Sequence, residues 1–173
     1  MSKIIKFLAL FFYYGLFSKL PNYVFPGGKI FNALRILCLK VILHIDKNCR
    51  IMRNVYVGNG KDISIGAFSR INENVRLDNV VIGEHVMIAR DTIILGKMHG
   101  FEDIDTPMNL QERVFYKPTV IEDNVWIGTR VIIMPGKTIR KGCIIGAGAV
   151  LTKDTVENGI YAGVPANLIK YRK

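Results

Sequence analysis

The sequence is poor in cysteine, has no acidic residue in its first 45 positions and contains no apolar run long enough to cross a membrane. Its three cysteines, Cys38, Cys49 and Cys143, are odd in number and form no CxxC pair, so they indicate neither a disulfide framework nor a cysteine zinc site. We therefore expect a reduced, cytoplasmic setting. The chain has 173 residues, of which 50% are hydrophobic and 22% charged, which predicts one ordered domain and excludes a disordered protein.

The net charge of +10 is unevenly distributed along the chain. Residues 1–45 contain six Lys or Arg residues and no Asp or Glu, whereas the remainder contains 18 basic and 14 acidic residues. Because the sequence has no platform of interleaved basic and aromatic residues, we expect no nucleic-acid partner. A cationic segment that is also apolar better matches an anionic membrane surface.

Residues 1–44 are predicted to form a short helical region. Every residue from 7 to 17 is apolar, aromatic or Gly, but this run of 11 is shorter than the roughly 20 residues that span a bilayer, and no signal-peptide cleavage site follows it. Residues 29–44 have an amphipathic helical pattern. Its apolar half would either make a peripheral contact with the inner face of the membrane or pack against the fold or a neighbouring subunit. The polar half consists of Lys29, Asn32, Arg35, Lys40 and His44.

Aliphatic residues recur at every sixth position, in five groups of three. This period indicates short strands separated by corners, with three strands making one triangular coil of about 18 residues. Small or β-branched residues usually follow four positions after each anchor, except at Lys61 and Lys137, and they suit the inside of such a coil. The fifteen anchors are Ile45, Ile51, Val57, Ile65, Ile71, Leu77, Ile82, Ile88, Ile94, Ile121, Ile127, Ile133, Ile139, Ile145 and Leu151.

We therefore predict an all-β parallel β-helix of about five coils over residues 45–156, followed by a tail at 157–173. Glycines that directly follow an anchor, such as Gly66 and Gly128, mark corners where the backbone is tight or adopts an unusual φ. The spacing between two anchors grows to 39 residues from 82 to 121, which is one coil plus about 21 residues. A loop is therefore predicted to leave the coil at about 95–119, and loops of this length are usually functional or disordered.

Several motifs occur in a fixed order along residues 63–170, and together they resemble the hexapeptide-repeat acyltransferases, in the branch of maltose, galactoside, streptogramin and polysaccharide O-acetyltransferases. One hexapeptide stretch is a weak signal, whereas the ordered set is specific. The resemblance implies a left-handed β-helix, acetyl-CoA as cosubstrate, and a homotrimer with acyl-CoA sites between subunits. The matching stretches are IGEHVMIA (82–89), His99, KPTVIEDNVWIG (117–128), MPG (134–136), IGAGAV (145–150), TKD (152–154) and AGVPA (162–166).

Acetyl transfer from a thioester to a hydroxyl needs a base at the attacking oxygen, and histidine suits this task because it is largely neutral near pH 7. His44 is predicted on the polar side of the helix and His85 at an outward corner. His99 lies at the start of the predicted loop and matches the catalytic histidine of the family. The resemblance implies that His99 removes the acceptor proton with no covalent acyl-enzyme and no metal. Glu102, Asp103 or a backbone carbonyl could orient its ring.

The resemblance also implies where the two substrates bind. In the family, pantetheine runs along the outside of the later coils against backbone groups, and basic residues meet the CoA phosphates. The candidate cofactor-binding residues are therefore Gly128, Thr129, Ala147, Thr152, Lys153 and Lys170. For the acceptor, Asn72 and Asp78 lie where relatives present polar groups to a sugar. Trp126, the single tryptophan, is predicted to face outward toward the acceptor and the thioester or toward a neighbouring subunit.

The leading hypothesis is an acetyl-CoA-dependent O-acetyltransferase that acts on a hydroxyl of a saccharide, either a surface polysaccharide or its precursor. The alternatives on the same scaffold are N-acetylation of an amino sugar, acetylation of an antibiotic, and a β-helix without catalytic activity. Zinc chemistry of the carbonic anhydrase type is disfavoured because the histidines at 44, 85 and 99 lack the close spacing of zinc ligands.

Overall fold

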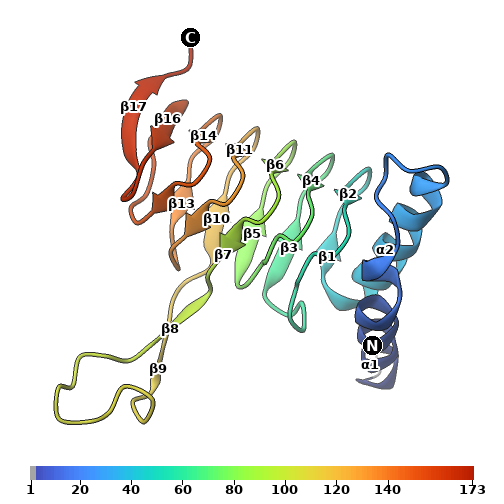
Figure 1. The fold of residues 1–173 in the computed structure, drawn as a ribbon, viewed down its shortest axis with the longest axis horizontal. Coiled ribbons are helices and arrows are strands. Elements are labelled where there is room, and N and C mark those ends of the chain that lie inside the picture. Colours follow the sequence, from blue (N-terminus) through green and yellow to red (C-terminus); the bar gives the residue numbers. More distant parts are fainter. Residues whose placement is uncertain (1–2) are drawn as a thin grey trace.

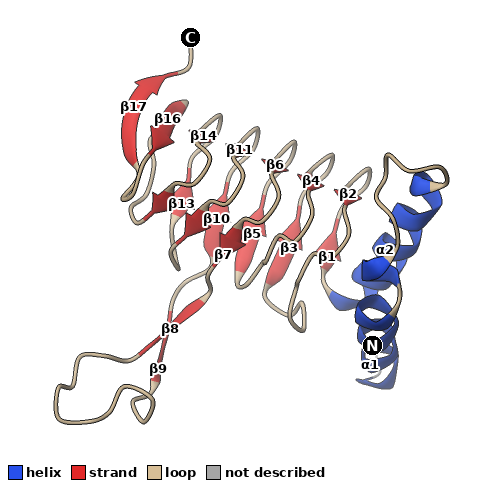
Figure 2. Ribbon diagram, in the orientation of Figure 1, coloured by secondary structure: helices blue, strands red, loops and turns tan. Residues whose placement is uncertain are grey.

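The computed structural model describes residues 3–173 as two short helices followed by a solenoid of parallel strands (Figures 1 and 2). The helices cover one end of the solenoid, and the C-terminus lies at the other end (Figure 1). The helical segments are α1 (Lys3–Gly15), the 3-10 turn η1 (Phe17–Lys19) and α2 (Gly28–Ile42).

Three sheets form the faces of the solenoid, and the chain visits them in turn. Sheet A contains β1 (His44–Ile45), β3 (Ile63–Ile65), β5 (Val80–Ile82), β10 (Thr119–Ile121) and β13 (Thr138–Ile139). Sheet B contains β2 (Arg50–Ile51), β4 (Arg70–Ile71), β6 (Met87–Ile88), β11 (Trp126–Ile127), β14 (Ile144–Ile145), β16 (Gly159–Ala162) and β17 (Asn167–Tyr171). Sheet C contains β7 (Ile93–Ile94), β12 (Ile132–Ile133) and β15 (Val150–Leu151), and bridges at Tyr56 and Arg76 extend it to the earlier coils.

The strand register follows the period of six. Ile65 pairs with Ile82 in sheet A, and Ile127 pairs with Ile145 in sheet B, so each anchor lies over the anchor of the next coil. All fifteen anchors are buried, with at most 6% of their surface exposed. Each coil thus covers the apolar interior of its neighbours. The predicted parallel β-helix with a short helical N-terminal region is confirmed.

Two structural requirements are met by different residues at the corners. Gly66 and Gly128 are needed because neighbouring coils approach closely, since a Cβ atom at Gly128 would lie 2.6 Å from the backbone nitrogen of Ala147. Neither has a positive φ. Where a residue other than glycine has a positive φ, it is most often an asparagine, such as Asn48 with φ of 59° and Asn124 with φ of 57°. Asparagine tolerates this backbone region better than most residues.

Between β7 and β10 the chain leaves the solenoid at the corner that joins sheets C and A. Here β8 (Lys97–His99) and β9 (Arg113–Phe115) pair in antiparallel fashion, with His99 opposite Arg113. The hairpin and the loop that closes it project away from the solenoid (Figure 1). The segment predicted as a loop at 95–119 therefore contains a two-stranded hairpin, and the solenoid resumes at Thr119.

The C-terminal residues 157–173, expected as a tail, contain two strands. β16 pairs in parallel with β14 and so continues sheet B beyond the fifth coil. β17 then returns in antiparallel pairing with β16. The edge of the last coil is thereby covered by the chain itself.

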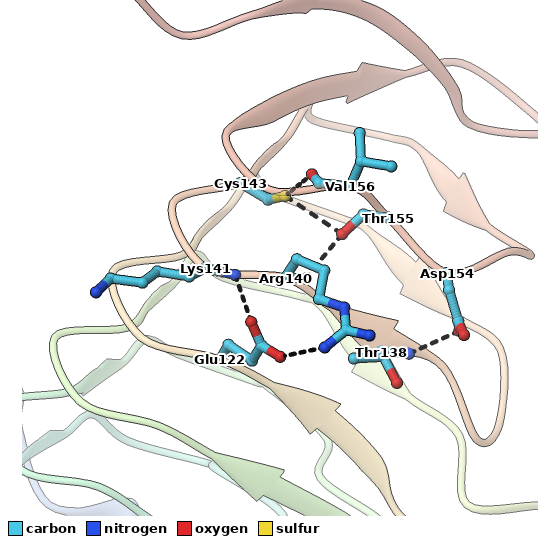
Figure 3. A network of polar contacts seen from close by, with 8 residues as sticks. All are labelled: Glu122, Thr138, Arg140, Lys141, Cys143, Asp154, Thr155 and Val156. Atoms are coloured by element: carbon cyan, nitrogen blue, oxygen red, sulfur yellow. Dashed lines mark hydrogen bonds and ion pairs between the residues drawn. The ribbon is translucent and has the colours of Figure 1, made fainter.

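A polar network joins the fourth and fifth coils near the corner between sheets A and B (Figure 3). The Glu122 carboxylate accepts one hydrogen bond from Nη1 of Arg140 and one from the backbone nitrogen of Lys141, each 2.8 Å long. The Thr155 hydroxyl accepts a bond of 2.8 Å from the backbone nitrogen of Arg140. These contacts supply partners for backbone groups where the strands end.

The N-terminal helices pack on the first coil through polar as well as apolar groups, and Leu39 and Ile42 of α2 belong to the core. Arg35 is fully buried, and its guanidinium donates hydrogen bonds to the carbonyl oxygens of Phe17, Leu20, Pro21 and Ile51. The amphipathic pattern of 29–44 placed Arg35 on the polar half of the helix, yet it is buried together with the apolar Leu39 and Ile42. The first coil has no preceding coil to satisfy its outer backbone groups, so a multivalent donor such as arginine is favoured here.

Large apolar side chains of the same helices remain on the surface. Phe7 and Phe11 of α1 are 66% and 64% exposed, and Ile30 and Leu37 of α2 are each 65% exposed. Within residues 3–173, neither helix combines the length and the hydropathy needed to cross a membrane.

Candidate active site

His99 ends strand β8, at the point where the hairpin leaves the body of the protein. Its side chain is exposed, and it faces an open pocket of about 330 Å³ between the hairpin and the edge of sheet C. The pocket brings together residues of the second and third coils and both hairpin strands. It is lined by Arg76, Asp78, Ile93, Leu95, Lys97, Met98, His99 and Arg113.

Three cations surround His99 in this pocket, and none of them was predicted from the sequence. Lys97 and Arg113 belong to the hairpin, and Arg113 is the cross-strand partner of His99. Arg76 comes from the second coil, where its guanidinium lies 4.6 Å from the centre of the Tyr56 ring. Positive charge placed in this way can stabilise an oxyanion or hold an anionic part of a substrate.

The predicted orienting groups of His99 have other roles in the structure. The Asp103 carboxylate accepts hydrogen bonds from the backbone nitrogens of Thr106, at 3.3 Å, and Asp105, at 2.9 Å. A hydrogen bond from the Thr106 side chain and then the one from Asp105 hold the pKa of Asp103 below its ordinary value. Glu102 is exposed on the same loop. Among residues 3–173 no group is hydrogen-bonded to the His99 ring, so both its nitrogens face the pocket or solvent.

The predicted cofactor-binding residues border the two edges of sheet C. Gly128, Thr129 and Ala147 lie at the corner between sheets B and C, where Gly128 packs directly on Ala147. Thr152 and Lys153 follow β15, at the corner between sheets C and A. Ala147 and Lys153 are exposed, and Thr152 is half-buried. These residues thus border sheet C, and the hairpin leaves the solenoid at one edge of that sheet.

The sixth predicted cofactor-binding residue, Lys170, does not border sheet C. It lies on β17, where it pairs with Ile160 of β16 at the end of sheet B.

The predicted acceptor residues are divided between two regions. Asp78 lines the same pocket as His99. The side chain of Asn72 donates a hydrogen bond of 3.0 Å to the carbonyl oxygen of Ile88 and so serves the stacking of two coils. Trp126 lies on the outer surface of sheet B and is 49% exposed. Because the hairpin leaves at the corner opposite sheet B, Trp126 and His99 are on different sides of one chain.

The other two histidines lie away from this pocket. His44 is on the surface, 3.3 Å from the carboxylate of Asp46. His85 stacks on Phe68 at the corner between sheets A and B, with ring centres 4.9 Å apart. Residues 3–173 contain no group of three His, Cys, Asp or Glu side chains arranged to hold a metal ion.

Sequence and structure comparisons identify the family. The family described as bacterial transferase hexapeptide (six repeats) matches residues 118–153. Galactoside O-acetyltransferase of Escherichia coli (strain K12) is 33% identical over 129 residues, which cover 73% of this chain and 62% of that protein. WbbJ of the same strain, whose name assigns it to O-acetyl transfer in lipopolysaccharide biosynthesis, is 31% identical over 156 residues, covering 72% of this chain and 80% of WbbJ.

A solved structure of a galactoside acetyltransferase in complex with coenzyme A has a TM-score of 0.79 to this chain at 28% identity, and it covers 99% of this chain and 84% of that one. The fold is a parallel solenoid with an inserted hairpin, and the relatives above match it in sequence or in fold. The chain therefore belongs to the hexapeptide-repeat transferases. Its relatives within this class include galactoside and lipopolysaccharide O-acetyltransferases, which lie in the wider branch that the motifs resemble. The chain spans less than two thirds of the length of the galactoside O-acetyltransferases that it matches, 62% and 63%.

Proposed function

We propose that the protein is an acetyl-CoA-dependent O-acetyltransferase that transfers an acetyl group to a hydroxyl of a saccharide, with His99 as general base. The observation that carries this proposal is the open pocket that His99 shares with Asp78 at the base of the hairpin. A neutral imidazole can accept the proton of one sugar hydroxyl, and a carboxylate can accept a hydrogen bond from another. Membership of a family of acetyltransferases supports acetyl transfer as the reaction.

The reaction would proceed by direct attack. The acceptor oxygen forms a bond to the thioester carbonyl carbon while its proton moves to a ring nitrogen of His99. The tetrahedral intermediate then collapses, the bond between carbon and sulfur breaks, and the imidazolium returns the proton to the departing CoA thiolate. Arg76, Lys97 and Arg113 surround the pocket with positive charge, which favours the oxyanion of the intermediate.

Acetyl-CoA would lie along sheet C and bring its thioester to the hairpin. The residues that border this sheet are small or glycine at one corner and polar at the other, as an extended pantetheine arm requires. Gly128 and Ala147 leave little side-chain bulk over the backbone, and Lys153 can meet a phosphate. A solved neighbour of the same fold is described as a complex with coenzyme A, which supports the same ligand class here.

The complete site would form between subunits of a homotrimer. The hairpin and its closing loop expose apolar side chains that the single chain leaves uncovered, including Phe115 at 80% and, in the loop, Ile104 at 94%. Trp126 and Met87 are also exposed, side by side on sheet B. A second copy would bring its sheet B against this hairpin and so unite Trp126 with His99. Sedimentation velocity should give the mass of three chains, and a monomer at all concentrations would contradict this assembly.

The acceptor would be a surface polysaccharide or its precursor, and the protein would be cytoplasmic with a peripheral contact to the inner face of the membrane. The name of WbbJ supports a polysaccharide setting. The surface of α1 presents Phe7 and Phe11 beside a segment with lysines and no acid, which fits an anionic bilayer. Phe7→Ser/Phe11→Ser should reduce sedimentation with phosphatidylglycerol vesicles without lowering the melting temperature. Unchanged sedimentation would contradict membrane contact.

A panel of saccharides tests the activity directly. Release of the CoA thiol in the presence of a saccharide, together with mass spectrometry of the product, should detect O-acetylation. His99→Ala should lower turnover by about 10²-fold to 10⁴-fold, because it removes the general base. His44→Ala removes another exposed histidine and is the matched control, which should keep full activity. Equal turnover of His99→Ala and the native protein would contradict the assigned role.

A further inference from the structure

A second pocket lies far from His99, at the junction between the helices and the first coils. It has a volume of about 590 Å³ and opens beside sheet B near the corner between sheets A and B. The side chains that matter here are Lys29 of α2, Arg50 of β2, Arg70 of β4 and His85, together with the rings of Tyr23 and Phe68. We call this group the basic pocket. No Asp or Glu lines it.

The arginines of the basic pocket are placed in direct register. Arg50 and Arg70 are cross-strand partners in the parallel pair formed by β2 and β4, and adjacent strands are separated by about 4.8 Å. Like charges in opposed positions of a sheet are destabilising when nothing lies between them. The ion pairs among residues 3–173 join His44 to Asp46 and Arg140 to Glu122, so neither arginine of the pocket has a carboxylate partner. This arrangement favours binding of an anion.

Two side chains of the basic pocket, Arg50 and His85, each contact an aromatic ring. The Arg50 guanidinium lies 4.4 Å from the centre of the Tyr23 ring. The His85 ring stacks on Phe68 with an angle of 6° between the ring planes, and both residues have the positive φ of a corner position. Stacking reduces the rotamer freedom of these side chains, so less entropy is lost when they bind a ligand. The pocket is also large enough for more than a single ion.

We infer that the basic pocket binds a phosphoryl group, and that this group belongs to a phosphorylated saccharide that is the acceptor. Two guanidinium groups side by side match the oxygens of a phosphate or diphosphate through paired hydrogen bonds, and Lys29 adds a third charge. The assignment to the acceptor rests on the proposed function, in which sheet B of one copy lies against the hairpin of another and so brings this pocket toward His99 of the neighbouring copy. Binding of the phosphoryl group does not, because it follows from the charges and the geometry of the pocket alone.

Calorimetric titration with inorganic pyrophosphate and with glucose 1-phosphate tests the site. The native protein should bind both ligands. Arg50→Gln/Arg70→Gln should bind them at least about tenfold more weakly, because hydrogen bonds to a charged group are lost. Arg53→Gln is the matched control, since Arg53 is an exposed arginine of the same coil that does not line the pocket. No binding to the native protein, equal binding to the double variant, or an equal loss in Arg53→Gln would overturn the site.

Kinetics then tests the link to the acceptor. The double variant should raise the KM for sugar phosphates, leave the KM for acetyl-CoA unchanged, and have no effect on neutral sugars. Acetylation confined to neutral sugars, with the variant unaffected, would overturn the acceptor assignment. If no sugar is acetylated while pyrophosphate binding still depends on the two arginines, the proposed function fails and the anion site stands.

Vesicles distinguish the source of the phosphoryl group. If the double variant still sediments with phosphatidylglycerol vesicles but no longer binds pyrophosphate, the phosphoryl group belongs to a soluble sugar phosphate. If the double variant loses both vesicle sedimentation and pyrophosphate binding, and pyrophosphate displaces the native protein from the vesicles, the phosphoryl group belongs to a lipid. That result would overturn the soluble acceptor.

Discussion

The solenoid buries mainly aliphatic side chains, whereas the helices that precede it bury polar side chains beside aliphatic ones. In the solenoid, Ile, Leu and Val point inward at every sixth position and are covered by the coil on either side. In α2, Arg35 and Asn32 are buried together with Leu39 and Ile42, while Ile30 and Leu37 face outward. A coil with a neighbour on both sides has backbone partners on both sides, whereas the first coil, which has no preceding coil, obtains some of them from side chains.

This contrast shows that the end of a solenoid needs hydrogen-bond partners for its backbone groups as well as cover for its apolar side chains. The Asn32 side chain donates to the carbonyl of Cys49 at 3.2 Å and accepts from the backbone nitrogen of Ile51 at 2.8 Å. The buried Tyr13 hydroxyl donates to the carbonyl of Val55 at 2.8 Å, and burial raises the pKa of this phenol above its ordinary value. The helices thus act as a cap that keeps several large apolar side chains exposed.

The largest effect on stability is expected inside the solenoid. Ile82→Ala should lower the free energy of unfolding by about 4 kcal/mol, because it leaves a cavity between two packed coils. Urea unfolding followed by circular dichroism measures the loss. Val81→Ala, in the same strand but 43% exposed, is the control and should change the free energy by less than about 1 kcal/mol. Equal losses in the two variants would contradict the packing of the anchors.

A somewhat smaller loss is expected at the cap. Arg35→Leu should lower the free energy of unfolding by about 3 kcal/mol, since buried carbonyls lose a charged donor although the apolar volume is retained. Leu37→Ala, on the exposed side of the same helix, should be within about 0.5 kcal/mol of the native protein. If Leu37→Ala were the more damaging variant, the apolar side of α2 would be its packing face after all.

The smallest effect is expected for a surface ion pair within the solenoid. Glu122→Gln weakens the contact with Arg140 that joins the fourth and fifth coils (Figure 3), and should cost about 1 kcal/mol or less because both side chains are partly solvated. High salt should reduce the difference. Glu157→Gln, which changes an exposed neighbour, should have no measurable effect when both variants are compared by urea unfolding. A loss as large as that of Ile82→Ala would show that the pair is not a surface contact.

The solenoid was predictable because its signal is periodic and local. Ile127 and Ile145 are 18 residues apart, and the same alternation that makes a strand also sets the register between coils. The corner glycines follow from the same repeat. The hairpin was visible as an interruption of the period, but its internal pairing was not, because no repeat fixes which residues of a long loop face each other. Lys97 and Arg113 were therefore missed as neighbours of His99.

The cap and the basic pocket escaped prediction for a related reason. Arginine is usually a surface residue, and only the geometry of the first coil shows that Arg35 has several carbonyl partners. The register of Arg50 with Arg70 depends on the longer first coil, whose strands pair at a spacing of 20 residues. The position of Lys29 depends on how α2 docks, which no repeat encodes. Polar sites formed between elements thus need the tertiary structure.

The most direct test of the proposed chemistry is a calorimetric titration of acetyl-CoA into the native protein and into His99→Ala, with turnover measured on the same samples. We expect both proteins to bind acetyl-CoA with the same affinity within about a factor of two, since the proposed position of the ligand is along sheet C, while turnover of the variant falls about 10²-fold or more. Absence of binding to the native protein, or equal turnover of the two, would contradict it.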